Sequence, residues 1–201
     1  MSFINAVSRE INCKIVYYGA GLGGKTTNLQ WIYKNTAGQS AEPMISLTTE
    51  EDRTLFFDFV PLEIGKILGY HLRFHLYTVC GQVRYEPTRK LVLRGVDGLI
   101  FVADSQAGRM DDNLAALCEL ESNLRELERD PGAVPLVFQL NKRDLEDAMP
   151  SEEMKNVLVP GEAEVFEAIA SEGVGVFETL RGIGKLVVED VKQRLMPAAK
   201  S

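Results

Sequence analysis

Short apolar runs alternate with longer amphipathic segments along the chain. The apolar runs cover residues 11–18, 99–104 and 134–140. They are rich in β-branched residues, which is typical of strands covered on both faces of a parallel sheet. The amphipathic segments, with apolar residues at helical spacing, cover residues 26–35, 110–129 and 176–195. This alternation predicts an open α/β sheet with right-handed crossovers and helices on both faces.

One section departs from the alternation. Residues 54–62 and 70–78 both have the pattern of strands, and the linker between them, which contains Gly65 and Gly69, is too short for a helix. We expect these two strands to pair as an antiparallel hairpin at the edge of an otherwise mostly parallel sheet. Residues 164–169 are predicted to form a further strand.

Composition narrows the class of protein. The chain has 201 residues, 45% of them hydrophobic, which predicts one compact domain over residues 1–201. The net charge of -7 and the absence of a lysine or arginine block argue against nucleic-acid binding. Its three cysteines, at unrelated spacings, form no disulfide or zinc pattern. No apolar run approaches the ~18 residues of a membrane span. We therefore expect a cytoplasmic protein with no membrane span.

The clearest motif is GAGLGGKTT, residues 19–27, which satisfies G-x-x-x-x-G-K-[ST] between a predicted strand and a predicted helix. In such a loop, backbone N–H groups and the helix N-terminus bind phosphate. Lys25 would reach the β- and γ-phosphates, and the Thr26 hydroxyl would ligate Mg²⁺. The plainer interpretation is a glycine-rich turn with a solvated lysine. The residues predicted to bind the nucleotide here are Gly19, Gly21, Leu22, Gly23, Gly24, Lys25, Thr26 and Thr27.

A second motif concerns the base. Asn141, Lys142 and Asp144 form N-K-x-D directly after a predicted strand, where ligands of open α/β sheets bind. A carboxylate at Asp144 can accept hydrogen bonds from guanine N1–H and its amino group, whereas adenine offers neither donor at that edge. The motif alone is also compatible with a charged turn. Ala170 and Ser171 follow the predicted strand 164–169; they would offer N–H groups to guanine O6, or form an ordinary strand-to-helix turn.

These motifs resemble those of the small Ras-like GTPases, and more narrowly the bacterial MglA-type GTPases of cell polarity and gliding motility. The matching stretches are REINCKIVYYG (9–19), RTLFFDF (53–59), RFHLYTV (73–79), GQV (81–83), GVDGLIFVADS (95–105), NKRDL (141–145) and GVGVFETL (173–180). The resemblance implies a Ras-like P-loop GTPase fold and a GTP/GDP switch with Mg²⁺. It also implies a monomer when free, recruited to cell poles, with a roadblock-domain (MglB-like) GTPase-activating protein and polarity or motility effectors as partners.

The resemblance also assigns residues to GTP hydrolysis. Gln82 would orient the attacking water, and the Gly81 N–H would contact the γ-phosphate. Arg53 would act as an arginine finger supplied by the same chain; the alternative is a surface arginine on a loop. For the switch residue that contacts Mg²⁺ and the γ-phosphate, spacing alone leaves Thr48, Thr49 and Thr54 open. The resemblance favours Thr54.

Two positions depart from common patterns. Thr78 stands where the D-x-x-G motif of Ras-like proteins has its aspartate, although MglA-type proteins share the threonine. Asp58, on the neighbouring predicted strand, is a candidate to replace that carboxylate through water; the alternative is an ordinary aspartate at a sheet edge. Cys80 replaces a proline of the MglA pattern, which would free the loop backbone and restore an N–H donor.

Other residues and other functions fit the sequence less well. His71 and His75 share one face of a predicted strand without a matching carboxylate or cysteine, so solvated side chains are favoured over a metal site. Trp31 on the first predicted helix is expected to pack. The main alternative function is a guanine-nucleotide-binding scaffold with little hydrolysis. A nucleotide kinase would need lid arginines and an acceptor site that the sequence does not offer.

Overall fold

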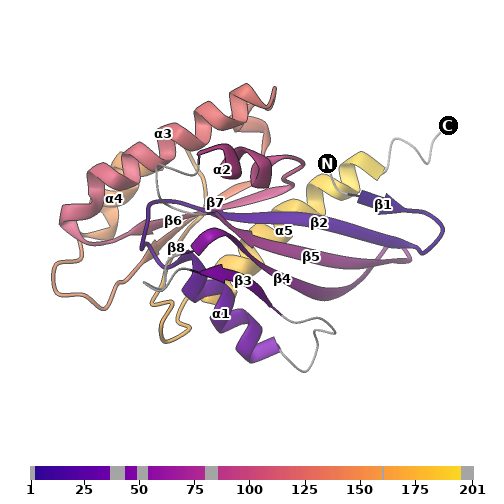
Figure 1. Cartoon of the computed structure of the whole chain (residues 1–201), viewed down its shortest axis with the longest axis horizontal. Helices are drawn as coiled ribbons and strands as arrows, with labels where there is room; N and C mark the ends of the chain where they lie inside the picture. The colour runs from indigo at the N-terminus through magenta and orange to yellow at the C-terminus, as the bar shows by residue number, and fades with distance from the viewer. Residues whose placement is uncertain (1–2, 37–43, 49–53, 80–85, 160, 196–201) are drawn as a thin grey trace.

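The computed structural model describes residues 3–36, 44–48, 54–79, 86–159 and 161–195 (Figure 1). Its strands are β1 (Phe3–Asn5), β2 (Glu10–Tyr18), β3 (Ile45–Thr48), β4 (Thr54–Ile67), β5 (Tyr70–Thr78), β6 (Gly98–Asp104), β7 (Leu136–Asn141) and β8 (Val165–Glu167). Its helices are α1 (Lys25–Thr36), α2 (Glu86–Leu93), α3 (Met110–Glu126), α4 (Ser151–Leu158) and α5 (Val176–Leu195), with short 3₁₀ segments at Ala107–Arg109 and Pro131–Ala133.

The strands form one sheet in the order β3-β4-β5-β2-β6-β7-β8, and β1 pairs with β2. The pairings β5-β2, β2-β6, β6-β7 and β7-β8 are parallel, whereas β3-β4, β4-β5 and β1-β2 are antiparallel. The predicted α/β fold with a mostly parallel sheet is therefore confirmed, and so is the antiparallel hairpin. The hairpin's first strand is not at the edge, however, because β3 pairs along its outer side.

Several boundaries differ from the sequence prediction for identifiable reasons. The third helix ends at Glu126 rather than at residue 129, because Glu128 adopts a left-handed backbone (φ 55°) that terminates the helix. The strand expected over 134–140 begins at Leu136, after Pro135, which has no N–H for the sheet. Strands β1 and β3 and helices α2 and α4 were not predicted, because their three to eight residues are too few to show a clear period.

Helices cover both faces of the sheet (Figure 1). On one face, α1 and α5 pack through Leu29, Ile32, Ile183 and Val187. On the other, α2, α3 and α4 bury a second set of apolar side chains that includes Leu93, Leu120 and Met154. β6 is buried along its whole length, as expected of a strand covered on both sides. Among the helices of the described ranges, none is long and apolar enough to cross a membrane.

A chain of buried amide and hydroxyl groups crosses the core beneath the α1 face. Asn28 of α1 and Gln139 of β7 exchange two hydrogen bonds, Asn28 Nδ2 to Gln139 Oε1 at 2.8 Å and Gln139 Nε2 to Asn28 Oδ1 at 3.0 Å. Gln139 Nε2 also donates to Thr179 Oγ1 on α5 at 2.9 Å. At the two ends, Asn28 donates to the Gly24 carbonyl and Thr179 to the Gly175 carbonyl. The chain thus runs from the loop before α1 to the loop before α5.

Removing both Asn28 and Gln139 should cost less than the sum of the two single removals. Gln139→Leu leaves the Asn28 carboxamide buried without its partner, and we expect a loss of about 3 kcal/mol in the free energy of unfolding. In Asn28→Leu/Gln139→Leu the paired groups leave together, so the total loss should fall below the sum of the single losses. Urea unfolding of the four proteins in a double-mutant cycle measures both quantities; strict additivity would show that the pair does not act as a unit.

Candidate nucleotide-binding site

The loop over residues 19–24 connects the carboxyl end of β2 to the first turn of α1, as the motif predicts. Glycine is needed at both its ends. A Cβ at Gly19 (φ +138°) would lie 2.2 Å from the Val102 carbonyl oxygen, and one at Gly24 (φ +97°) would lie 2.1 Å from Asn141 Nδ2. Leu22 also has a left-handed backbone (φ 62°), and its side chain is 65% exposed. The loop therefore closes tightly on its neighbours and leaves one apolar side chain in solvent.

Lys25 is folded over its own loop. Its side chain is buried, and Nζ donates to the carbonyl oxygens of Gly19 at 2.9 Å and Ala20 at 2.7 Å. An ammonium group has three donors, and these two contacts hold the Lys25 charge beside the N–H groups of the loop. Positive charge and backbone N–H groups at a helix N-terminus together form an anion site, so the arrangement fits the predicted phosphate chain.

Beside Lys25, one buried carboxylate joins three elements. Asp58 of β4 is fully buried, and its Oδ2 accepts from the Thr26 hydroxyl at 2.6 Å and from the Thr78 hydroxyl at 2.7 Å. The Asp58 N–H in turn donates to Thr78 Oγ1 at 2.9 Å. The sequence made Asp58 only a candidate to act here through water, whereas the structure shows direct hydrogen bonds to the Thr26 and Thr78 hydroxyls. Thr78 therefore does not leave the site without a carboxylate: its hydroxyl helps to orient the one supplied by β4.

The base side of the site is organised by Asn141 at the end of β7. Asn141 Nδ2 donates to the Gly23 carbonyl at 2.8 Å, and its Oδ1 accepts from the Ala170 N–H at 3.0 Å. One buried side chain thus connects the phosphate loop to the loop that follows β8. The Ala170 N–H, predicted to donate to guanine O6, in this structure holds Asn141. Asp144 lies exposed in the turn after β7, and Ser171 is likewise exposed.

Two residues that the sequence analysis missed lie between the phosphate loop and the turn after β7. Asp104, fully buried at the end of β6, accepts from Lys142 Nζ at 2.6 Å and lies 3.6 Å from Arg109 Nε. Arg109 also donates to the Gly21 carbonyl at 2.6 Å. The position of Asp104 at the carboxyl end of a predicted strand was a usable signal, because ligands of such sheets bind there. No local pattern marks Arg109.

Of the remaining predicted residues, Thr27 lies in the first turn of α1, and Thr54 begins β4, where its backbone pairs with Thr48. The catalytic predictions Gln82 and Arg53, together with Gly81, lie outside the described residues. Cys80 and Thr49 do as well. Their roles stay predictions.

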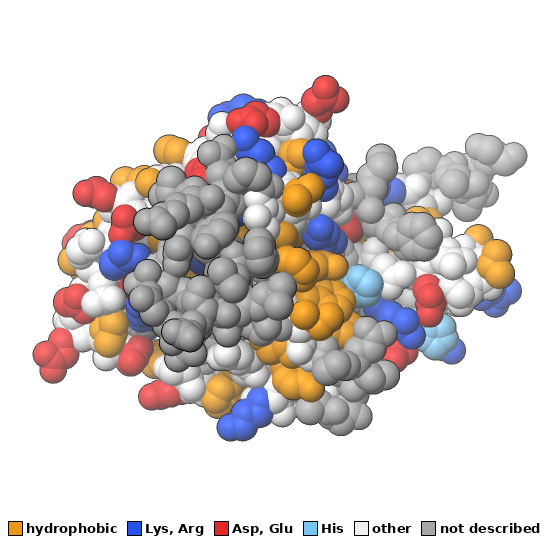
Figure 2. All heavy atoms as spheres, in the orientation of Figure 1, with side chains coloured by type: hydrophobic (Ala, Val, Ile, Leu, Met, Phe, Trp, Pro, Cys, Tyr) orange, Lys and Arg blue, Asp and Glu red, His pale blue; other side chains and the backbone are white. Residues whose placement is uncertain are grey.

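Away from the phosphate loop, aromatic side chains gather on the α2 side of the sheet. Figure 2 shows hydrophobic side chains gathered beside a histidine on the face toward the viewer. On this side of β4 and β5, the rings of Phe57 and Phe59 contact Tyr77, and His75 meets Phe59 edge-on.

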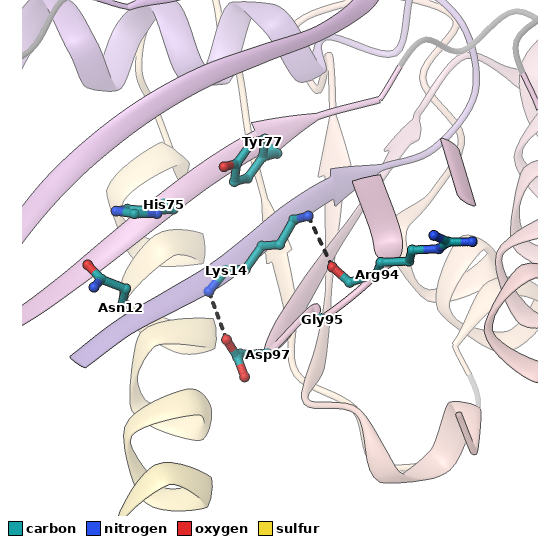
Figure 3. Close-up of a pocket in the computed structure, with 7 residues that line it drawn as sticks. All are labelled: Asn12, Lys14, His75, Tyr77, Arg94, Gly95 and Asp97. Carbon is teal, nitrogen blue, oxygen red and sulfur yellow. Dashed lines mark hydrogen bonds between the residues drawn. The ribbon is translucent and has the colours of Figure 1, made fainter. Parts of the chain in front are cut away.

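The adjoining pocket includes Lys14, Tyr77 and Asp97 in its lining (Figure 3) and contains no residue of the phosphate loop. Lys14 Nζ donates to the Arg94 carbonyl at 3.1 Å and lies 4.7 Å from the centre of the Tyr77 ring. Burial lowers the pKa of Lys14, and the Asp97 carboxylate opposes that shift. Within the described ranges, no group of three or more histidine, cysteine and acidic side chains could hold a metal ion.

Comparison with known proteins places this site in a family. The model of the ADP-ribosylation factor (Arf) family matches residues 1–189. The mutual gliding-motility protein MglA of Myxococcus xanthus is 56% identical over 193 residues, which span 96% of this chain and 99% of MglA. Human ADP-ribosylation factor-like protein 4A is 30% identical over 149 residues, 74% of this chain and 66% of that protein. The chain therefore belongs to the Arf family of Ras-like small GTPases and is similar to MglA over nearly its whole length.

Proposed function

We propose that this chain is a single guanine-nucleotide-binding domain that binds GTP, hydrolyses it and thereby switches a motility or cell-polarity system. The relative from Myxococcus xanthus is named as a gliding-motility protein and aligns with 96% of the chain, which supports the biological part of the proposal. In this proposal the protein acts in the cytoplasm, is recruited to cell poles, and is regulated by a roadblock-domain (MglB-like) GTPase-activating protein.

The observation that carries the biochemical part is the pair of hydrogen bonds made by Asn141. It fixes the phosphate loop at Gly23 and the loop after β8 at Ala170. A ligand with a phosphate chain at one end and a base at the other fits this arrangement, because the two loops lie on opposite sides of one side chain. In the proposal, Lys25 binds the phosphates, Asp144 binds guanine N1–H and its amino group, and Ser171 borders O6.

The residues beside Lys25 fit a magnesium ion. A threonine hydroxyl that ligates a cation needs an acceptor for its proton, and Asp58 accepts the Thr26 proton at 2.6 Å. Thr26, with Thr54 from the start of β4, would hold Mg²⁺. When bound, the ion would neutralise charge on the β- and γ-phosphates. Asp58 would hold Thr26 in its ligating orientation.

Hydrolysis would depend on Gln82 to orient water and on Arg53 to meet the charge of the γ-phosphoryl group. If both residues are ordered only by a partner, basal turnover should be slow, ~10⁻⁴ to 10⁻³ per second as for unaided Ras-like proteins. Loss of the γ-phosphate would then release the switch segments.

Single-turnover hydrolysis of bound GTP tests the proposal. We expect a roadblock-domain partner to accelerate the wild-type protein by at least about 10³-fold, and Arg53→Ala and Gln82→Ala each to remove most of that acceleration while GTP still binds. Phosphate release measures hydrolysis, and nucleotide occupancy measured in parallel shows whether a variant still binds GTP.

The outcome also decides the alternative function. A wild-type protein that retains GTP while hydrolysing it no faster than buffer, with or without the partner, would be a nucleotide-dependent scaffold rather than a GTPase switch.

A further inference from the structure

The indole of Trp31 lies directly against the loop that follows β8. Trp31 is in the second turn of α1, and Gly173 lies in the loop between Ala170 and Gly175. A Cβ added to Gly173 would be 1.9 Å from Trp31 Cε2 and 2.2 Å from Nε1. The ring therefore occupies the space that any other residue at position 173 would need. Gly173 also has φ +80°, which favours glycine independently.

The loop itself is compact, with its tip in solvent. The Ile169 N–H donates to the Val174 carbonyl and the Glu172 N–H to the Ile169 carbonyl, both at 3.0 Å, which closes the loop on itself. Ser171, Glu172 and Val174 are exposed. The internal bonds fix the shape of the loop, but its position relative to the phosphate loop requires contacts from outside.

Trp31 can supply that position because α1 begins at the phosphate loop. Lys25 and Trp31 lie in one continuous helix, so the rigid helix fixes the indole relative to the phosphate site. Asn35 Nδ2 donates to the Trp31 carbonyl at 2.8 Å, and the indole packs partly buried against the core beneath α1. Contact with Gly173 then transmits the placement of α1 to the loop.

We propose that Trp31 is a positioning residue for base recognition: it holds residues 171–173 where their backbone meets the O6 edge of guanine. The inference rests on the proposed function, because it assumes that this loop borders the base. It assigns to Trp31 a role beyond the packing expected from sequence. Because the indole acts through Gly173, its loss should weaken contacts to O6 and leave the Lys25 side of the site intact.

The test compares two nucleotides that differ at one atom. We would measure dissociation of GDP and of 6-thioguanosine diphosphate, in which sulfur, a weaker hydrogen-bond acceptor, replaces O6 while N1–H and the amino group stay, from the wild type, Trp31→Phe and Trp31→Ala. Trp31→Ala should release GDP roughly three- to tenfold faster, the value of about one hydrogen bond, with a smaller change for the analogue. The GDP release rate of Trp31→Phe should fall between those of the wild type and Trp31→Ala. Tyr33→Ala is the matched control, because Tyr33 is on the same helix and also packs partly buried against the core.

A merely structural role predicts a different pattern. If Trp31→Ala releases both nucleotides faster by the same factor, or leaves the wild-type preference unchanged, Trp31 does not position the base loop and the inference is wrong, while guanine binding stands. If the wild type itself does not distinguish GDP from the analogue, the loop does not read O6, and that part of the proposed function fails with it.

A second measurement needs no variant. Trp31 is the single tryptophan of the chain, so all intrinsic tryptophan fluorescence comes from this indole. Emission should change when GDP binds to the nucleotide-free wild type, because the base then contacts the loop that lies against the ring. Identical spectra without GDP and at saturation would count against the proposal even if Trp31→Ala failed to fold.

Discussion

Asp144→Asn is expected to lower the affinity for GDP by at least about 100-fold. A carboxylate at this position accepts two hydrogen bonds from guanine, and bonds to a charged group contribute about 1.5–3 kcal/mol each. The carboxamide has only one oxygen, and its NH₂ group would face the donors of the base. Asp144 is exposed in the turn after β7, so the substitution should not disturb folding. Isothermal titration of the nucleotide-free protein measures the loss directly.

Xanthosine diphosphate supplies the positive control. Xanthine carries a carbonyl oxygen where guanine has its amino group, so the carboxamide introduced by Asp144→Asn can donate to it, and this variant should prefer XDP to GDP. Glu146→Gln, which removes a charge from an exposed acid two positions along the same turn, is the matched variant and should bind GDP normally. Unchanged GDP affinity in Asp144→Asn would contradict base recognition by this residue.

The second large effect is expected at Asp58. Asp58→Ala removes the acceptor of both the Thr26 and the Thr78 hydroxyls. Partners of metal ligands typically contribute about 10–100-fold to metal affinity. We therefore expect Mg²⁺ to slow GDP release from the wild type. In Asp58→Ala, the Mg²⁺ concentration needed for the same slowing should rise about 10–100-fold. A titration of the GDP release rate with Mg²⁺ gives the apparent metal affinity of each protein.

The neighbouring strand offers a rescue. Thr78 lies beside Asp58, to which it is joined by two hydrogen bonds, and it occupies the D-x-x-G position. In Asp58→Ala/Thr78→Asp a carboxylate returns to the site from β5, and part of the Mg²⁺ affinity should return with it. Thr78→Asn in the same background is the uncharged control. If Asp58→Ala alone keeps wild-type Mg²⁺ dependence, the carboxylate does not support the metal site.

The sequence was most informative where a single segment carries its own signal. The hairpin of β4 and β5, the long helix α5 and the buried strand β6 each show a period or an apolar run long enough to interpret, and the phosphate loop is a local motif. Contacts between segments far apart in the sequence could not be predicted from local patterns. Thr26 meets Asp58 only because of the place of β4 in the sheet, and Arg109 reaches the Gly21 carbonyl across 88 positions of sequence.

The buried pair of Asn28 and Gln139 has a consequence for how such a protein diverges. Each side chain satisfies the other through two bonds, and the pair spans 111 positions of sequence. A lineage that lost one amide would carry an unpaired polar group in its core until the second changed as well. We therefore expect the two positions to change together among descendants or to stay fixed together. The relative placement of the loop before α1 and the loop before α5 should then be retained wherever the pair is retained.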